Sequence, residues 1–268
     1  MTSEDLRHLQ LVMLQIAKDI KKVCDENDIK YFLDSGSLLG AVRHGGFIPW
    51  DDDFDIGMTR ENFEKFCKIG QEELGNKYFV QTWDSEKYYG RPLAKVRLNN
   101  TQYIEASEQN NKINHGIFVD ILPYDKTTSK KAMVGYRKKL TRIRSLIYCK
   151  CGYYNERSLP VRIITKVLSL LLNKKYLVKK YEELATKFNK SNSGYLYAHT
   201  GTARLGTWIM PKDVITELEE IEFEDTTFSA PKNYDKYLKN AYGDYMVLPD
   251  ESKRVGGHGV VFLEFGNY

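Results

Sequence analysis

The chain has 268 residues, of which 42% are hydrophobic and 28% charged, with a formal net charge of +4. This supply of apolar residues excludes a disordered protein and suffices for one large domain, or for one domain with an appendage. Four cysteines without Cys-x-x-Cys spacing exclude a disulfide framework, and the lack of a signal peptide or of any long uncharged apolar stretch leads us to expect a cytoplasmic protein.

The N-terminal half combines helical and strand patterns. Apolar residues three and four apart from Leu6 to Val23 predict an amphipathic helix, which Ser3 can cap. A buried strand is expected over 29–33, followed by a Gly-Ser turn leading into a short helix and a loop at 45–49. The remaining expected elements are a helix over 60–74 and strands over 78–82, 93–98, 102–104 and 117–122.

An acidic segment, Trp50-Asp-Asp-Asp-Phe-Asp-Ile-Gly-Met58, is the most informative part of the sequence. In a strand over 53–58, Asp53 and Asp55 point to one side with Cα atoms ~6–7 Å apart, while Phe54 and Ile56 point to the other. Carboxylates so arranged suit a hard cation, Mg²⁺ or Mn²⁺. An acidic surface loop would explain Asp51 and Asp52, but not acids that alternate with apolar residues.

Two further features support phosphate chemistry. Asp120 interrupts the apolar strand Ile117-Phe-Val-Asp-Ile-Leu122, where a buried carboxylate needs a metal or a basic partner. Gly36-Ser37, at the start of a short helix, can offer backbone N–H groups and a hydroxyl to a phosphate. Three aspartates and this turn together indicate a metal-carboxylate site suited to phosphoryl transfer.

The middle of the chain is strongly basic. Residues 130–180 contain fifteen Lys or Arg and one acid, Glu156. Two helices are expected here, over about 131–149 and 161–189, and one more near 234–242. The basic segment, with the apolar series from Ile163 to Leu172, is expected to contact an anionic membrane surface; a solvated helical face is the alternative.

These patterns predict an α/β (α+β) fold with a mixed sheet, flanking helices and a mostly helical basic region. We expect a catalytic core over 1–125, the basic helical region over 126–190, and a C-terminal segment over 191–268 that packs back on the core.

The combination of a Gly-Ser turn, an Asp-apolar-Asp strand and an apolar-Asp-apolar strand resembles the DNA polymerase β-like nucleotidyltransferase superfamily. More narrowly, GSLLGAVRHGGFIPWDDDFDIGM (36–58) is similar to the LicD family of phosphocholine transferases, whose relatives include the fukutin-related ribitol-phosphate transferases. The similarity continues in HGIFVDILPYD (115–125) and YLKNAYGDYMVLPDESKR (237–254).

The resemblance implies an Mg²⁺-dependent (or Mn²⁺-dependent) enzyme that transfers phosphocholine from CDP-choline to a sugar hydroxyl of a teichoic acid or lipopolysaccharide precursor, releasing CMP. It implies that Asp53, Asp55 and Asp120 bind the metal and are catalytic. Gly36 and Ser37 would contact the donor phosphates. The nearby cations Arg43, Lys95 and Arg97 can neutralise the diphosphate, or can be structural.

Choline is a quaternary ammonium, which proteins usually hold on aromatic faces. Trp50, Trp83 and Tyr88-Tyr89 are available, although most aromatic residues of such a chain belong to its core.

Several alternatives remain open. The chain could instead transfer another CDP-linked polyol phosphate, ribitol phosphate or glycerol phosphate. An Asp-x-Asp glycosyltransferase would explain Asp53 and Asp55 but not Gly36-Ser37 or Asp120. An inert nucleotidyltransferase-like fold that binds membranes is the non-enzymatic alternative. Without an aromatic platform or a recognised motif in the basic region, nucleic acid is not an expected partner.

Overall fold

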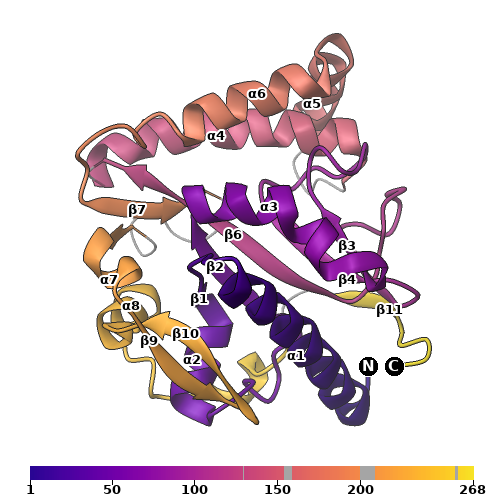
Figure 1. Ribbon diagram of the computed structural model, residues 1–268. Helices are drawn as coiled ribbons and strands as arrows, with labels where there is room; N and C mark the ends of the chain where they lie inside the picture. The colour runs from indigo at the N-terminus through magenta and orange to yellow at the C-terminus, as the bar shows by residue number, and fades with distance from the viewer. Residues whose placement is uncertain (129, 154–158, 200–208, 257–258) are drawn as a thin grey trace.

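A mixed β-sheet forms the centre of the molecule (Figure 1), and the computed structural model describes residues 1–128, 130–153, 159–199, 209–256 and 259–268. The strand order is β1-β2-β6-β4-β3, with β7 paired to β6 and β8 paired to β7. Only the β2–β6 pair is parallel within this described sheet. The strands are β1 (Phe32–Leu33), β2 (Asp55–Thr59), β3 (Tyr78–Gln81), β4 (Ala94–Leu98), β6 (Phe118–Thr127), β7 (Tyr195–Ala198) and β8 (Met210–Pro211).

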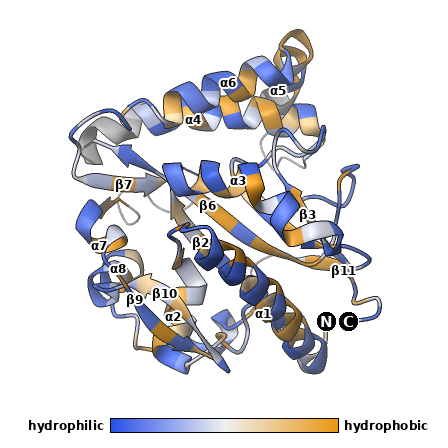
Figure 2. Cartoon of the chain, viewed as in Figure 1, coloured by the Kyte–Doolittle hydropathy of each residue, from blue (hydrophilic) through white to orange (hydrophobic). Residues whose placement is uncertain are grey.

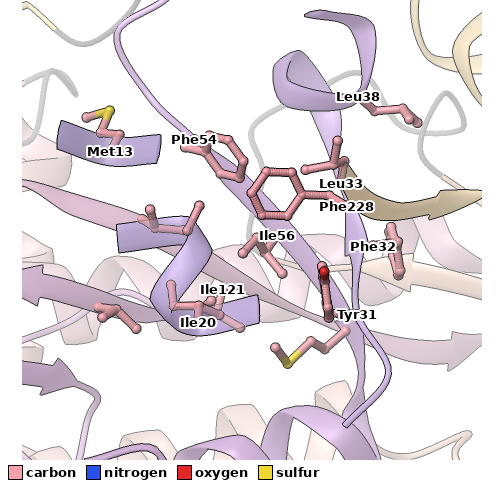
Figure 3. Close-up of a cluster of buried hydrophobic side chains, with 14 of the residues drawn as sticks. Met13, Ile20, Tyr31, Phe32, Leu33, Leu38, Phe54, Ile56, Ile121 and Phe228 are labelled. Atoms are coloured by element: carbon pink, nitrogen blue, oxygen red, sulfur yellow. The ribbon is translucent and has the colours of Figure 1, made fainter. Parts of the chain in front are cut away.

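Helices α1 (Ser3–Glu26) and α3 (Arg60–Leu74) pack against each other and against the sheet. The N-cap of α1 is Thr2, whose side chain accepts the Asp5 N–H in a capping box, so the prediction of Ser3 as the cap is wrong by one residue. Phe54 and Ile56 are fully buried, as predicted, and Figure 3 shows them among Ile20 of α1 and Phe228. Burial of the apolar side chains of the acidic segment fixes which way its aspartates point.

In its described residues, 130–153 and 159–190, the basic region forms three helices rather than the expected two: α4 (Lys130–Cys151), α5 (Leu159–Leu171) and α6 (Lys174–Ala185). The predicted helix over 161–189 is interrupted because Asn173 caps α6, accepting the Lys175 N–H at 2.8 Å. Helices α4 and α6 share a separate cluster of buried residues, including Leu140, Ile147 and Tyr181, to which none of the described side chains of α5 belongs. All three helices form a layer on the α3 side of the sheet in Figure 1.

The C-terminal part contains strands that the sequence patterns did not reveal. A hairpin of β9 (Leu218–Phe223) and β10 (Thr226–Pro231) lies beside β1, and β11 (Val260–Glu264) pairs with β5 (Gln102–Glu105). Helix α7 (Lys212–Thr216) precedes the hairpin, and α8 (Tyr234–Tyr242) follows it with the bounds that were predicted. Short 3-10 turns occupy Gly75–Lys77 and Glu251–Lys253. The mixed sheet with its helices confirms the predicted α/β class.

Within the described residues, no helix combines the length and the apolar character that crossing a bilayer requires.

Candidate active site

Asp55, Asp120 and Lys95 form a row across three neighbouring strands. The parallel register of β2 and β6 places Asp55 opposite Asp120, and the antiparallel register of β4 and β6 places Lys95 opposite the same Asp120. Partners in register lie on the same face of a sheet. The fold therefore brings together two of the predicted carboxylates and one of the predicted cations, although they come from segments up to 65 residues apart.

Several charged groups lie close together in this row. Burial, together with the charges of Asp53 and Asp120, raises the pKa of the Asp55 carboxyl well above its usual range. Lys95 is fully buried, with its Nζ 2.8 Å from Asp120 Oδ1 and 3.8 Å from Glu105 Oε1. The same ammonium lies 3.2 Å from the centre of the Phe118 ring. Lys95 thus neutralises Asp120, whereas Asp55 lies against other carboxylates.

The predicted Gly-Ser turn forms the first turn of α2 (Ser35–His44). Because the first intrahelical bond runs from the Leu38 N–H to the Asp34 carbonyl, Gly36 and Ser37 supply N–H groups that have no acceptor within the helix. The Ser37 Oγ accepts the Asp55 N–H at 2.8 Å, which ties this turn to the acidic strand. A Cβ at Gly36 would lie 2.5 Å from Asp51 Oδ2, so only glycine allows Asp51 to approach the helix N-terminus.

Asp34, which the sequence analysis did not single out, anchors the same turn. Its side chain is fully buried, accepts the Ser35 N–H at 2.8 Å, and accepts the Tyr124 hydroxyl at 2.9 and 3.0 Å. The Tyr237 hydroxyl of α8 also donates to it. Burial raises the pKa of the Asp34 carboxyl, and its hydrogen bonds to Tyr237 and Tyr124 oppose that rise. The sequence signal for this role was an Asp at the end of an apolar strand, just before the Gly-Ser turn. Its tyrosine partners could not be identified in this way, because they lie 90 and 203 residues away in the chain.

The other two predicted cations differ in their surroundings. Arg97 is fully buried, and its guanidinium donates to Gln81, to the Gly116 carbonyl and to Glu108. These contacts fit a structural role, away from Asp55. Arg43, in the last turn of α2, donates to the Tyr245 carbonyl at 2.8 Å. Burial lowers the pKa of its guanidinium, while the charge of Asp51 opposes that shift.

A further aromatic residue, Tyr242 at the end of α8, lies within electrostatic range of several of the acids. Shielding of its hydroxyl from water, together with the charges of Asp34 and Asp55, raises the pKa of that hydroxyl well above its usual range, while its side chain remains 41% exposed. Of the predicted aromatics, Trp50 has the Arg254 guanidinium 5.6 Å from its ring centre. Trp83 packs edge-on against Tyr181 in the helical layer, Tyr89 is fully buried and Tyr88 is exposed.

Comparison with known proteins shows the family of the chain. Residues 28–148 match the family model described as LicD/FKTN/FKRP, nucleotidyltransferase domain. The chain is 30% identical over 261 residues to the lipopolysaccharide cholinephosphotransferase LicD of Haemophilus influenzae, an alignment covering 94% of this chain and 96% of that protein. The chain belongs to the LicD family. It is also 44% identical over 92 residues to human ribitol 5-phosphate transferase FKRP, which covers 34% of this chain and 19% of the human protein.

The candidate site consists of carboxylates, which are ligands that a divalent cation can use. Within the described part of the chain, no group of three or more His, Cys, Asp or Glu side chains is already assembled as a metal-binding cluster. The chemistry of the donors nevertheless fits Mg²⁺, because Asp53, Asp55 and Asp120 offer only oxygen atoms. Burial first, and then the charges of Asp53 and Asp120, raise the pKa of the Asp55 carboxyl. A cation would relieve that repulsion.

Proposed function

We propose that this LicD-family protein is a phosphotransferase that moves phosphocholine from CDP-choline to a sugar hydroxyl of a cell-surface glycan precursor and releases CMP. The observation that carries the proposal is the pairing of Asp55 with Asp120 on adjacent parallel strands, beside the helix turn that contains Gly36 and Ser37. The whole-length similarity to a lipopolysaccharide cholinephosphotransferase supports the choice of donor and of a lipopolysaccharide or teichoic acid precursor as acceptor.

In the proposed reaction, the acceptor hydroxyl oxygen bonds to the choline-bearing phosphorus. The bond from that phosphorus to the bridging oxygen breaks, and its electron pair leaves with CMP. The hydroxyl proton passes to the carboxylate of Asp120, whose side chain is 13% exposed. The N–H groups of Gly36 and Ser37 bind the donor phosphates, assisted by the partial positive charge of the α2 N-terminus.

Asp53, Asp55 and Asp120 are the residues that would hold Mg²⁺, or Mn²⁺ in its place. When bound, the metal neutralises the charge of the diphosphate and of the leaving CMP. Lys95 keeps Asp120 in place through their 2.8 Å ion pair.

The test is a panel of donors. Purified protein is incubated with Mg²⁺ and CDP-choline, CDP-ribitol, CDP-glycerol, UDP-sugars or GDP-sugars, and the released nucleotide is measured. CMP release from CDP-choline, lost in Asp55→Asn and kept in the exposed control Asp213→Asn, supports the proposal. Release of UDP or GDP would instead indicate a glycosyltransferase, and no release with any donor would contradict an enzymatic role.

Ribitol phosphate transfer is the second candidate. It is favoured by the 44% identity to human ribitol 5-phosphate transferase FKRP, which is confined to 92 residues of this chain. The same panel separates the two donors, because preference for CDP-ribitol over CDP-choline would select this candidate.

We further propose that the protein works in the cytoplasm, at the inner face of a membrane where a lipid-linked glycan acceptor would be located. The support for a membrane location is the basic region over 130–180.

A further inference from the structure

Helix α5 buries polar side chains and exposes apolar ones, the reverse of an ordinary amphipathic helix. Its polar residues Thr165 and Ser169, one turn apart, are only 7% and 3% exposed. Ser169 faces α4, where Lys150 Nζ donates to its carbonyl at 2.8 Å and its own hydroxyl lies 3.7 Å from Cys149 Sγ. From residue 163 to the end of the helix, the apolar residues are 44% to 77% exposed: Ile163, Ile164, Val167, Leu168, Leu170 and Leu171.

This exposed face is continuous rather than scattered. The six residues lie within nine consecutive positions of one helix, and Tyr176 at the start of α6, 50% exposed, follows them. In Figure 1, α5 lies at the outer end of the helical layer, and Figure 2 shows hydrophobic residues there. A contiguous apolar surface of this kind marks a contact with another molecule or with a membrane.

The charges around this face favour a membrane over a second protein molecule as the partner. Lys166 of α5 is exposed, as are Lys175 and Lys179 of the following helix α6. They belong to a segment with fifteen basic residues and one acid over 130–180. A second copy of the chain placed symmetrically on this face would bring like charges together. An anionic lipid surface accepts both the apolar side chains and the lysines. With 13 residues, α5 is ~20 Å long, shorter than the ~30 Å bilayer core, so it suits a position in the interface plane.

We propose that α5 inserts its apolar face into the surface of an anionic bilayer, with Lys166, Lys175 and Lys179 contacting the lipid head groups. The inference deepens the proposed function by naming the element that would hold the enzyme beside a lipid-linked acceptor. Vesicle binding, however, requires no catalysis and is measured independently of it.

The experiment is co-sedimentation of the full chain with phosphatidylcholine vesicles, with and without phosphatidylglycerol as a third of the lipid, at low and high salt. One variant carries Leu170→Gln and Leu171→Gln; its matched control carries Val261→Gln and Phe262→Gln, on β11 and about half exposed. A second variant carries Lys166→Glu, Lys175→Glu and Lys179→Glu. Its control carries the same change at the exposed Lys30, Lys68 and Lys232.

The expected result is binding to the anionic vesicles that falls roughly tenfold or more in each α5-region variant and is unchanged in both controls. Circular dichroism and CMP release from CDP-choline with a water-soluble acceptor should be the same in all five proteins. Absence of binding at low salt, or full binding by the Leu170/Leu171 variant, would overturn the inference. It would also be overturned if wild type sedimented as a dimer that this variant dissociates without any vesicle binding. Loss of CMP release with vesicle binding intact would contradict the proposed function alone.

Discussion

The Lys95 ammonium lies 2.8 Å from the Asp120 carboxylate, with Lys95 fully buried and the Asp120 side chain 13% exposed. Each charge depends on the other, because an unpaired ion at this depth is strongly unfavourable. Lys95 lies on β4 and Asp120 on the neighbouring strand β6, where Asp120 is part of the candidate active site. A metal bound at Asp120 would share this carboxylate with Lys95.

Replacing Lys95 by methionine should therefore destabilise the protein by ~3–5 kcal/mol, because Asp120 and Glu105 lose the charge between them. Thermal unfolding with and without Mg²⁺ measures this, and Mg²⁺ should raise the Tm of Lys95→Met more than that of wild type. Adding Asp120→Asn should restore part of the stability. Lys77→Met, which removes a surface pair with Asp19, should cost at most ~1 kcal/mol. Equal losses of stability in Lys95→Met and Lys77→Met would contradict the role of Lys95 as the buried partner of Asp120.

The carboxylates themselves should differ in their effects on activity. Asp53→Asn, Asp55→Asn and Asp120→Asn should each lower kcat by roughly a hundredfold or more, because each removes charge at the phosphate-binding site. The first two should leave the fold intact, whereas Asp120→Asn should also destabilise the protein, because it leaves the buried Lys95 ammonium without its 2.8 Å partner. Asp52 is 2% exposed, and a Cβ at Gly256 would lie 2.7 Å from its Oδ2, so its carboxylate lies against the C-terminal loop. Asp52→Asn should be milder than Asp53→Asn. Equal losses of Mg²⁺-dependent activity would show that the side assigned to each aspartate is wrong.

The alternation of apolar and acidic residues was enough to predict which side chains of the acidic segment are buried. Phe54, Ile56 and Met58 are fully buried because their period of two matches a strand with one face on the core. The position of Asp120 in an apolar strand likewise predicted a metal or a basic partner for its carboxylate, because a buried carboxylate requires one. These local patterns depend only on neighbouring residues, and the family resemblance rested on the same segments.

The partners of these residues could not be read from local patterns. The register that sets Asp55 beside Asp120 and Lys95 depends on how β2, β6 and β4 pack, and the Tyr237 hydroxyl that reaches Asp34 comes from the other end of the chain. The break before α6 was missed because the apolar spacing continues across Leu172 and Asn173, and only the capping contact of Asn173 ends the pattern. Strands β9 and β11 were missed because most of their residues are exposed or half-exposed, which weakens the alternation of apolar and polar residues.

The Asp34 network should be sensitive to loss of one donor. Tyr124→Phe removes a hydroxyl that donates to a fully buried carboxylate at the N-terminus of α2, so we expect a loss of ~1–3 kcal/mol in the free energy of unfolding. Because the same carboxylate positions Gly36 and Ser37, kcat should fall as well. Urea unfolding and CMP release measure the two effects. Tyr245→Phe is the control, since its hydroxyl bonds the half-exposed Asp235 and should change stability by less than ~0.5 kcal/mol. A stable, fully active Tyr124→Phe variant would argue against the network.

Glu108 should make stability depend on acid pH. Burial alone would raise the pKa of its carboxyl, but the charges of Arg91 and Arg97 outweigh burial and lower the pKa to about 2 from an ordinary value of 4.5. The resulting stabilisation, on the order of 3 kcal/mol, is complete above about pH 4.5 and is lost as pH falls toward 2. Urea unfolding across this range should show a smaller pH dependence in Glu108→Gln. The exposed Glu183→Gln should behave as wild type, and an identical pH profile for Glu108→Gln would refute the assignment.

Tyr242 offers a test of how the donor head group is recognised. The residue is 41% exposed, and the charges of Asp34 and Asp55 act on its hydroxyl. We expect a quaternary ammonium to stack on its ring. Tyr242→Ala should raise the KM for CDP-choline by roughly tenfold, whereas Tyr242→Phe, which keeps the aromatic face, should stay close to wild type. The KM for CDP-glycerol should not respond to either change, because glycerol carries no cation. Tyr195→Ala, which removes a similarly exposed tyrosine on β7, is the control. Since both donors share the cytidine diphosphate group, an equal rise in KM for both in Tyr242→Ala would place Tyr242 at the nucleotide and not at choline.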